Sequence, residues 1–264
     1  MLFTKNIAAL LLGAAATLSS LAGAVPTAIN VTDFGHPSTL MTRATKFSSL
    51  KGSAATWSKL SQLCAQGKKK RDFPLGMSTS LPDTPRPPFG QANMVPDERV
   101  VTWPPDTPKG FTYVPQGKSN AAFSSGNGLW TYGLVTCLGI SVVGTPPSAI
   151  AEPRHLLHME STQLVMDAQW DTFEKRVKGA KLTAMRGYMS VPDTTRNLPS
   201  TWDAGMTQLT NDIIAEARTR LTTLTGAVPT VKVRPMSRAL AHETPYGTMW
   251  VDNRNEVYIE GLKA

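Results

Sequence analysis

The sequence predicts an α+β fold in which a mixed β-sheet or sandwich core is flanked by helices, within a single mature domain. Two observations support this prediction. Short runs rich in β-branched and aromatic residues, bounded by Gly, Pro and Asn, are typical of strands. Between them lie two longer segments in which apolar residues recur every three or four positions, as on the buried face of a helix. The sequence contains no internal repeat, which favours one domain.

The first part of the chain is expected to be removed during export and maturation. Residues 1–24 have the features of a secretory signal peptide: Lys5, an apolar run and an Ala22-Gly23-Ala24 cleavage motif. Residues 25–71 are rich in Ser, Thr, Ala and Lys, show little hydrophobic periodicity and end in Lys70-Arg71. We interpret them as a propeptide that a kexin-type processing protease cuts after this basic pair. The mature protein is therefore expected to be secreted and extracellular, with no attachment to a membrane.

The excess of basic residues belongs to these processed segments. Nine of the 27 Lys and Arg residues, but only one of the 19 acidic residues, precede Asp72, so the remaining chain carries both signs in equal number. The net charge of +8 therefore does not describe the mature domain. A basic face for nucleic acid is not indicated, and no nucleic-acid partner is expected.

Residues 72–126 form a proline-rich N-terminal extension of the mature chain, because ten of the twenty prolines fall between Pro74 and Pro115. Proline fixes the backbone φ angle and lacks an amide hydrogen, so this extension cannot be helical for long and should run extended. Short edge strands are expected within it at residues 99–103 and 111–114.

The rest of the chain is expected to combine helices and strands. One helix is predicted over 167–178 from an apolar stripe at positions i, i+3 and i+7. A second, over 201–224, has a longer apolar repeat, begins at a capping box of Ser200 and Asp203, and ends at Gly226. The expected strands are the segment that contains Trp130 and residues 138–143, 149–159, 181–189, 230–234, 248–251 and 256–260.

The number and positions of the cysteines predict one free, reactive thiol in the processed chain. The chain has two cysteines, and Cys64 lies in the expected propeptide, so processing would leave Cys137 alone. Exported domains normally pair their cysteines, and a single remaining thiol in a secreted protein indicates a reactive group. Cys137 directly precedes the predicted strand 138–143, where a thiol can be presented with backbone N–H groups around it. A structural role, as a small buried hydrophobic residue, is the alternative.

His155 and His158 lie on the predicted strand 149–159. Side chains alternate between the two faces of a strand, so only one of the two imidazoles can face Cys137. A thiol, an imidazole that ionises it and N–H donors are the components of nucleophilic thiol catalysis. A metal site made of Cys137 and both histidines is disfavoured, because histidines three residues apart suit zinc on a helix and no acidic cluster is evident. No metal and no cofactor are therefore expected.

The segment Thr131-Tyr132-Gly133-Leu134-Val135-Thr136-Cys137 resembles the T-x-G-L-G-S-C motif of the bacterial chemoreceptor glutamine deamidases of the CheD family. The catalytic domain of cytotoxic necrotizing factor toxins belongs to the same broad class. The resemblance covers about residues 127–262, and the histidine that follows the motif in that family is similar to His155. It implies Cys137 as nucleophile, His155 as base and Thr131 as the third member. The loop between cysteine and histidine is one residue longer here, which makes His158 the alternative base.

These observations predict that residues 127–264 form a deamidase-like catalytic domain of a secreted cysteine hydrolase acting on carboxamide C–N bonds. The enzyme would convert glutamine side chains of a target protein to glutamate, as a toxin or effector made as a proprotein. Two alternatives stay open. One is another thiol hydrolase, of the cysteine protease or transglutaminase type, and the other is a non-catalytic secreted binding protein on the same fold.

The propeptide is expected to keep such an enzyme inactive until export. The favoured mechanism is that the propeptide covers the cleft by packing over it. A disulfide between Cys64 and Cys137 is the less favoured mechanism, because the composition around Cys64 gives no sign that this residue is held in place.

Overall fold

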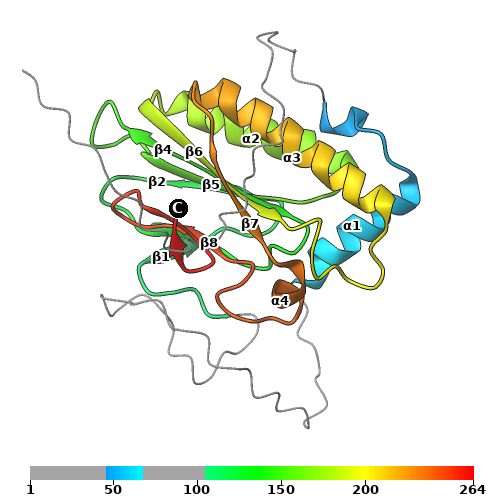
Figure 1. Cartoon of the computed structure of the whole chain (residues 1–264). Coiled ribbons are helices and arrows are strands. Elements are labelled where there is room, and N and C mark those ends of the chain that lie inside the picture. Colours follow the sequence, from blue (N-terminus) through cyan, green and yellow to red (C-terminus); the bar gives the residue numbers. More distant parts are fainter. Residues whose placement is uncertain (1–45, 68–104) are drawn as a thin grey trace, which may run out of the picture. The chain divides into compact units, whose positions relative to one another are not determined.

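The computed structural model of this protein describes residues 46–67 and 105–264, which belong to one folded unit (Figure 1). The expected signal peptide 1–24, the processing site at Arg71 and the expected strand at 99–103 lie outside the described residues. Within the two described ranges, no helix combines the length and the apolar character needed to cross a membrane.

Strands of the described residues form two five-stranded sheets. The first sheet has the order β1 (Phe111–Tyr113), β3 (Gly128–Thr131), β8 (Met249–Val251), β9 (Val257–Ile259) and β10 (Leu262–Lys263). The second sheet has the order β2 (Ser119–Ala122), β5 (Arg154–Met159), β4 (Leu138–Thr145), β6 (Thr183–Pro192) and β7 (Thr230–Arg234). Both sheets are mixed, since β1 is parallel to β3 and β6 is parallel to β7, whereas the other pairs are antiparallel. Every strand expected within the described residues is present; β2 and β10 were not predicted.

Two long helices cover one face of the second sheet (Figure 1). They are α2 (Gln163–Gly179), which packs on β5, and α3 (Ala204–Thr225), which packs on β6. Asp203 caps α3 by accepting a hydrogen bond of 2.9 Å from a backbone N–H of the first turn, and Gly226 ends the helix in the left-handed conformation. Both helix predictions are confirmed, although Asp203 rather than Ser200 is the capping residue.

The first sheet packs against the other face of the second sheet, so the layers are helices, second sheet and first sheet. Strand β4 shows this division, because Leu138, Ile140 and Val142 belong to the core on the helix side, whereas Val143 belongs to the core between the sheets. A short helix, α4 (Met236–Leu240), follows β7. The predicted α+β fold with a sandwich core flanked by helices is confirmed.

Residues 46–67, here called the helical segment, contain a 3₁₀ helix, η1 (Phe47–Ser49), and a longer helix, α1 (Ala54–Gln66). The Ser53 hydroxyl caps α1 by accepting from the Thr56 N–H at 3.1 Å. The expectation of little hydrophobic periodicity in the propeptide is wrong for α1, because its buried residues recur at helical spacing among small polar residues that dilute the pattern. These buried residues are Trp57, Leu60, Leu63 and Cys64.

The helical segment is anchored to the rest of the fold at both of its ends. The carboxylate of Asp167 on α2 accepts a hydrogen bond of 3.0 Å from the Phe47 N–H, and the guanidinium of Arg220 lies 4.2 Å from the centre of the Phe47 ring. Farther along, the carbonyl of Leu60 accepts a hydrogen bond of 2.8 Å from the Thr136 hydroxyl. The segment therefore contributes to the same folded unit as the expected catalytic domain, as do β1 and β2.

Candidate functional site

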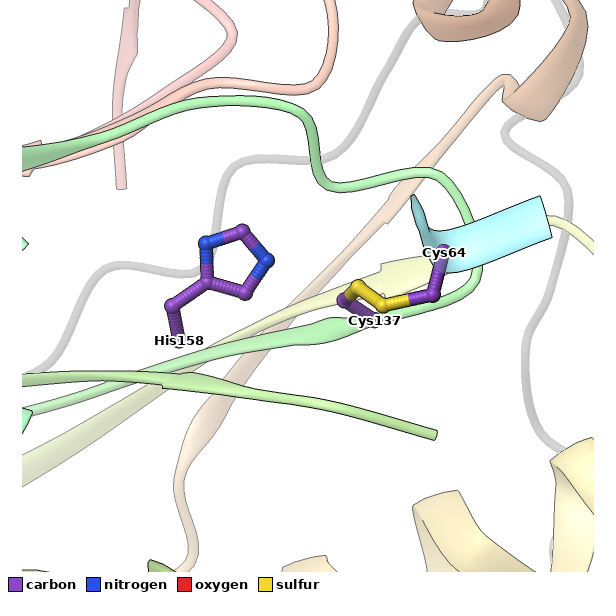
Figure 2. Close-up of side chains that lie close together, drawn as sticks. All are labelled: Cys64, Cys137 and His158. Carbon is purple, nitrogen blue, oxygen red and sulfur yellow. A yellow bond between two sulfur atoms is a disulfide. The ribbon is translucent and has the colours of Figure 1, made fainter. Parts of the chain in front are cut away.

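Cys137 is buried at the point where the chain enters β4, and its sulfur is bonded to that of Cys64 on α1 (Figure 2). The two Cα atoms lie 5.3 Å apart, within the range that a disulfide spans without backbone movement. The expectation that Cys64 is not held in place is wrong, because α1 fixes it against the core. These are the two cysteines of the chain, so Cys137 is not the lone free thiol expected from the sequence in this state.

His158 is the histidine that lies next to Cys137 (Figure 2). It is on β5 and pairs with Gly139 of β4, two residues beyond Cys137. A ring nitrogen of His158 and the sulfur atoms of Cys137 and Cys64 all lie within 4.8 Å of one another. The fold therefore places an imidazole beside the sulfur of the predicted nucleophile.

Thr131 orients this imidazole. Its hydroxyl lies 2.8 Å from Nδ1 of His158 and donates a hydrogen bond of 2.8 Å to the carbonyl of Val114. A hydroxyl has one proton, so the oxygen that donates to Val114 accepts from the Nδ1–H of His158. This arrangement places the ring proton on Nδ1 and leaves Nε2 as the basic nitrogen, which is the tautomer that a general base requires.

His155, the base implied by the family resemblance, does not join this group. Neighbouring β5 residues Leu156 and Leu157 belong to the cores on opposite sides of the second sheet, as the expected alternation of side chains requires. The Nε2–H of His155 donates to the carbonyl of Glu152 at 2.9 Å. Burial is the main reason that the pKa of His155 is lowered to about 4; the hydrogen bond to Glu152 acts against this shift, and the nearby charge of Arg176 adds to it. The structure thus brings together Cys137, the alternative base His158 and Thr131.

Acidification is expected to destabilise the fold through His155. Its folded-state pKa of about 4 lies below the ordinary value of 6.5, so the folded state favours the neutral ring. The contribution of His155 to the free energy of unfolding is therefore full above pH 6.5. It is lost as the pH falls toward 4, which lowers the free energy of unfolding by up to about 3 kcal/mol. The free energy of unfolding, measured with urea across this pH range, should change less with pH for His155→Gln than for the wild type. His242→Gln, at a partly exposed position, is the control, and parallel profiles for wild type and His155→Gln would contradict the expectation.

Arg234 is a residue of the site that no sequence pattern predicted. It is fully buried at the end of β7 and donates hydrogen bonds to the carbonyls of Leu134 (2.6 Å), Val135 (3.0 Å) and Cys137, and to the Ser190 hydroxyl (3.2 Å). Burial lowers its pKa to about 9, so the guanidinium stays charged at neutral pH. One cation therefore fixes the loop that carries the predicted nucleophile. The sequence gives no signal for this role, because arginines at strand ends are mostly exposed.

The site is closed in this state. Cys137, His158 and Thr131 all have no exposed surface. A surface groove of about 850 Å³ lies elsewhere, between the loop that precedes β5 and the C-terminal half of α2, and none of the three residues lines it. A molecule in solution can therefore reach Cys137 only after the elements that cover this residue have moved.

The side chains of Cys64, Cys137 and His158 are the one group of possible metal ligands found among the described residues. Two cysteine sulfurs and a histidine nitrogen suit zinc when the cysteines are thiolates. In the disulfide the two sulfurs are bonded to each other and are not thiolate ligands. The group fits a metal only after reduction.

Comparison of the chain with models of protein families and with curated proteins gave no match in either case. The resemblance to the CheD family is therefore not tested by these comparisons and stays a prediction from the sequence. The geometry adds that the first and last residues of this motif lie around one imidazole.

Proposed function

We propose that the protein is a secreted, cysteine-dependent protein glutamine deamidase, with Cys137 as nucleophile, His158 as base and Thr131 as the residue that orients the base. The observation that carries the proposal is the hydrogen bond between Thr131 and Nδ1 of a histidine whose ring lies beside the Cys137 sulfur. A thiol, a base and a third group that orients the base are the parts shared by thiol hydrolases on unrelated folds.

The reaction begins from the reduced form of the site. Nε2 of His158 takes the proton of the Cys137 thiol, and the thiolate attacks the carboxamide carbon of a substrate glutamine. The proton then passes to the leaving nitrogen, ammonia departs, and a thioester remains. His158 next takes a proton from water, which attacks the thioester carbonyl and releases glutamate and the Cys137 thiol. The net change is one glutamine side chain and one water converted to one glutamate side chain and ammonia.

Arg234 supports this reaction as a positioning residue. By binding the carbonyls of Leu134, Val135 and Cys137, it holds the backbone around the nucleophile in one conformation. Backbone N–H groups of the same loop are the proposed donors to the oxyanion, and their value depends on being fixed before the reaction. The partners under this proposal are a target protein bearing a glutamine and the kexin-type protease that matures the chain, in keeping with a toxin or effector.

A second candidate function is a non-catalytic secreted binding protein on this fold. The disulfide favours it, because Cys137 has no free thiol while bonded to Cys64. Another thiol hydrolase, of the protease or transglutaminase type, would use the same three residues.

One assay separates these candidates. Processed and reduced protein is incubated with a glutamine-containing peptide and with denatured casein, and ammonia is measured beside Cys137→Ala. Ammonia release that depends on Cys137, with a mass gain of about 1 Da per converted glutamine, supports the deamidase. Transfer of an added amine or cleavage of the peptide would indicate the other hydrolase classes. A fully reduced Cys137 with none of these products would overturn the enzyme proposal.

A further inference from the structure

We infer that the helical segment, residues 46–67, is a covalent inhibitor of the site within its own chain. The Cys64–Cys137 disulfide masks the nucleophile, and α1 closes the site until the disulfide is reduced and the segment is cut from the rest of the chain. The inference rests on the proposed function, and it specifies the regulation of that same site.

The disulfide is the first of the two barriers. The nucleophile of a thiol hydrolase is a thiolate, and the sulfur of Cys137 in this state is bonded to Cys64. Release needs a dithiol reductant, which supplies two electrons and two protons. The protein S–S bond breaks, one hydrogen goes to each cysteine sulfur, and the dithiol becomes a disulfide. An oxidising exterior keeps the bond closed, whereas a reducing compartment of a target cell opens it.

The packing of α1 is the second barrier. Thr136, the residue before Cys137, donates a hydrogen bond from its hydroxyl to the carbonyl of Leu60 on α1. Gly67, at the end of α1, approaches the same loop so closely that a Cβ there would lie 2.4 Å from the Gly133 carbonyl oxygen. Cys64 itself is fully buried and receives a hydrogen bond of 3.3 Å from the Gln116 side chain. Helix α1 therefore contacts the loop 131–137 before and after Cys64, and reduction alone leaves it in place.

The position of Cys64 in the chain links both barriers to processing. Cys64 lies shortly before the Lys70-Arg71 pair, so a cut there leaves the helical segment attached by the disulfide and by core contacts. A disulfide that served stability alone would not need a threonine-oriented histidine within 4.8 Å of its sulfurs. The arrangement therefore fits a nucleophile that is stored in oxidised form beside its base.

The test uses the full proprotein without its signal peptide, either intact or cut by a kexin-type protease, each with and without prior treatment with dithiothreitol. The readouts are iodoacetamide labelling of Cys137, followed by mass spectrometry, and ammonia release. Cys64→Ser removes the disulfide without removing α1, and Ser58→Ala, at an exposed position of the same helix, is the matched control.

Neither oxidised form is expected to be labelled at Cys137. The cut and reduced protein should be labelled fully, whereas intact Cys64→Ser should be labelled at least about tenfold more slowly, because α1 must first open locally. Labelling of the oxidised, intact protein would overturn the inference. Equal labelling rates for intact and cut Cys64→Ser would reject the role of α1. Fast labelling of the cut, reduced protein without ammonia would uphold the masking and reject the deamidase function.

Discussion

In processed and reduced protein, His158→Ala is expected to lower kcat/KM for ammonia release by about 10³-fold or more, whereas His155→Ala should lower it by less than about tenfold. The reason is that the imidazole of His158 lies beside the Cys137 sulfur and is oriented by Thr131, while His155 donates to Glu152. The sequence motif gives the opposite ranking, so the two variants discriminate directly between the motif and the geometry.

Two further variants complete this experiment. Cys137→Ala should match the loss seen with His158→Ala, because nucleophile and base act as one unit. Thr131→Val removes the hydroxyl at similar size and should cause a smaller loss, since the imidazole remains but is less well oriented. Near-ultraviolet circular dichroism checks that each variant is folded. A larger loss from His155→Ala than from His158→Ala, in folded protein, would show that His158 is not the base.

Arg234→Leu is expected to lower the free energy of unfolding by about 3 kcal/mol or more, because it leaves three buried carbonyls without their charged donor. The same variant should reduce ammonia release in the fraction that stays folded, since the loop that carries Cys137 loses its support. Denaturant unfolding gives the first quantity and activity per folded molecule gives the second.

Lys232→Met is the matched control for Arg234. It removes a cation from an exposed position two residues earlier on β7 and should change stability by less than about 0.5 kcal/mol. Arg234→Lys keeps the charge but cannot reach several carbonyls at once, so it should restore only part of the loss. Full stability of Arg234→Leu would show that the loop is held by other contacts.

The sequence by itself determined the fold class and most of the elements. Short runs of β-branched and aromatic residues placed the strands around Trp130 and Leu138, and helical apolar spacing placed the helix that ends at Gly226, because both patterns are local properties of the chain. It also singled out Cys137 and Thr131, and alternation along β5 showed that only one histidine could face the thiol. The short strands β2 and β10 were not predicted, since neither contains a β-branched or aromatic residue.

The tertiary structure alone decided which histidine this is. The antiparallel register of β5 against β4 pairs His158 with Gly139 and sets His155 against Val142, farther from Cys137 along β4. Register depends on contacts between strands that are distant in sequence, which no local pattern contains. For the same reason, only the folded chain reveals that Arg234 binds the loop 131–137 across about one hundred residues and that α1 brings Cys64 to Cys137.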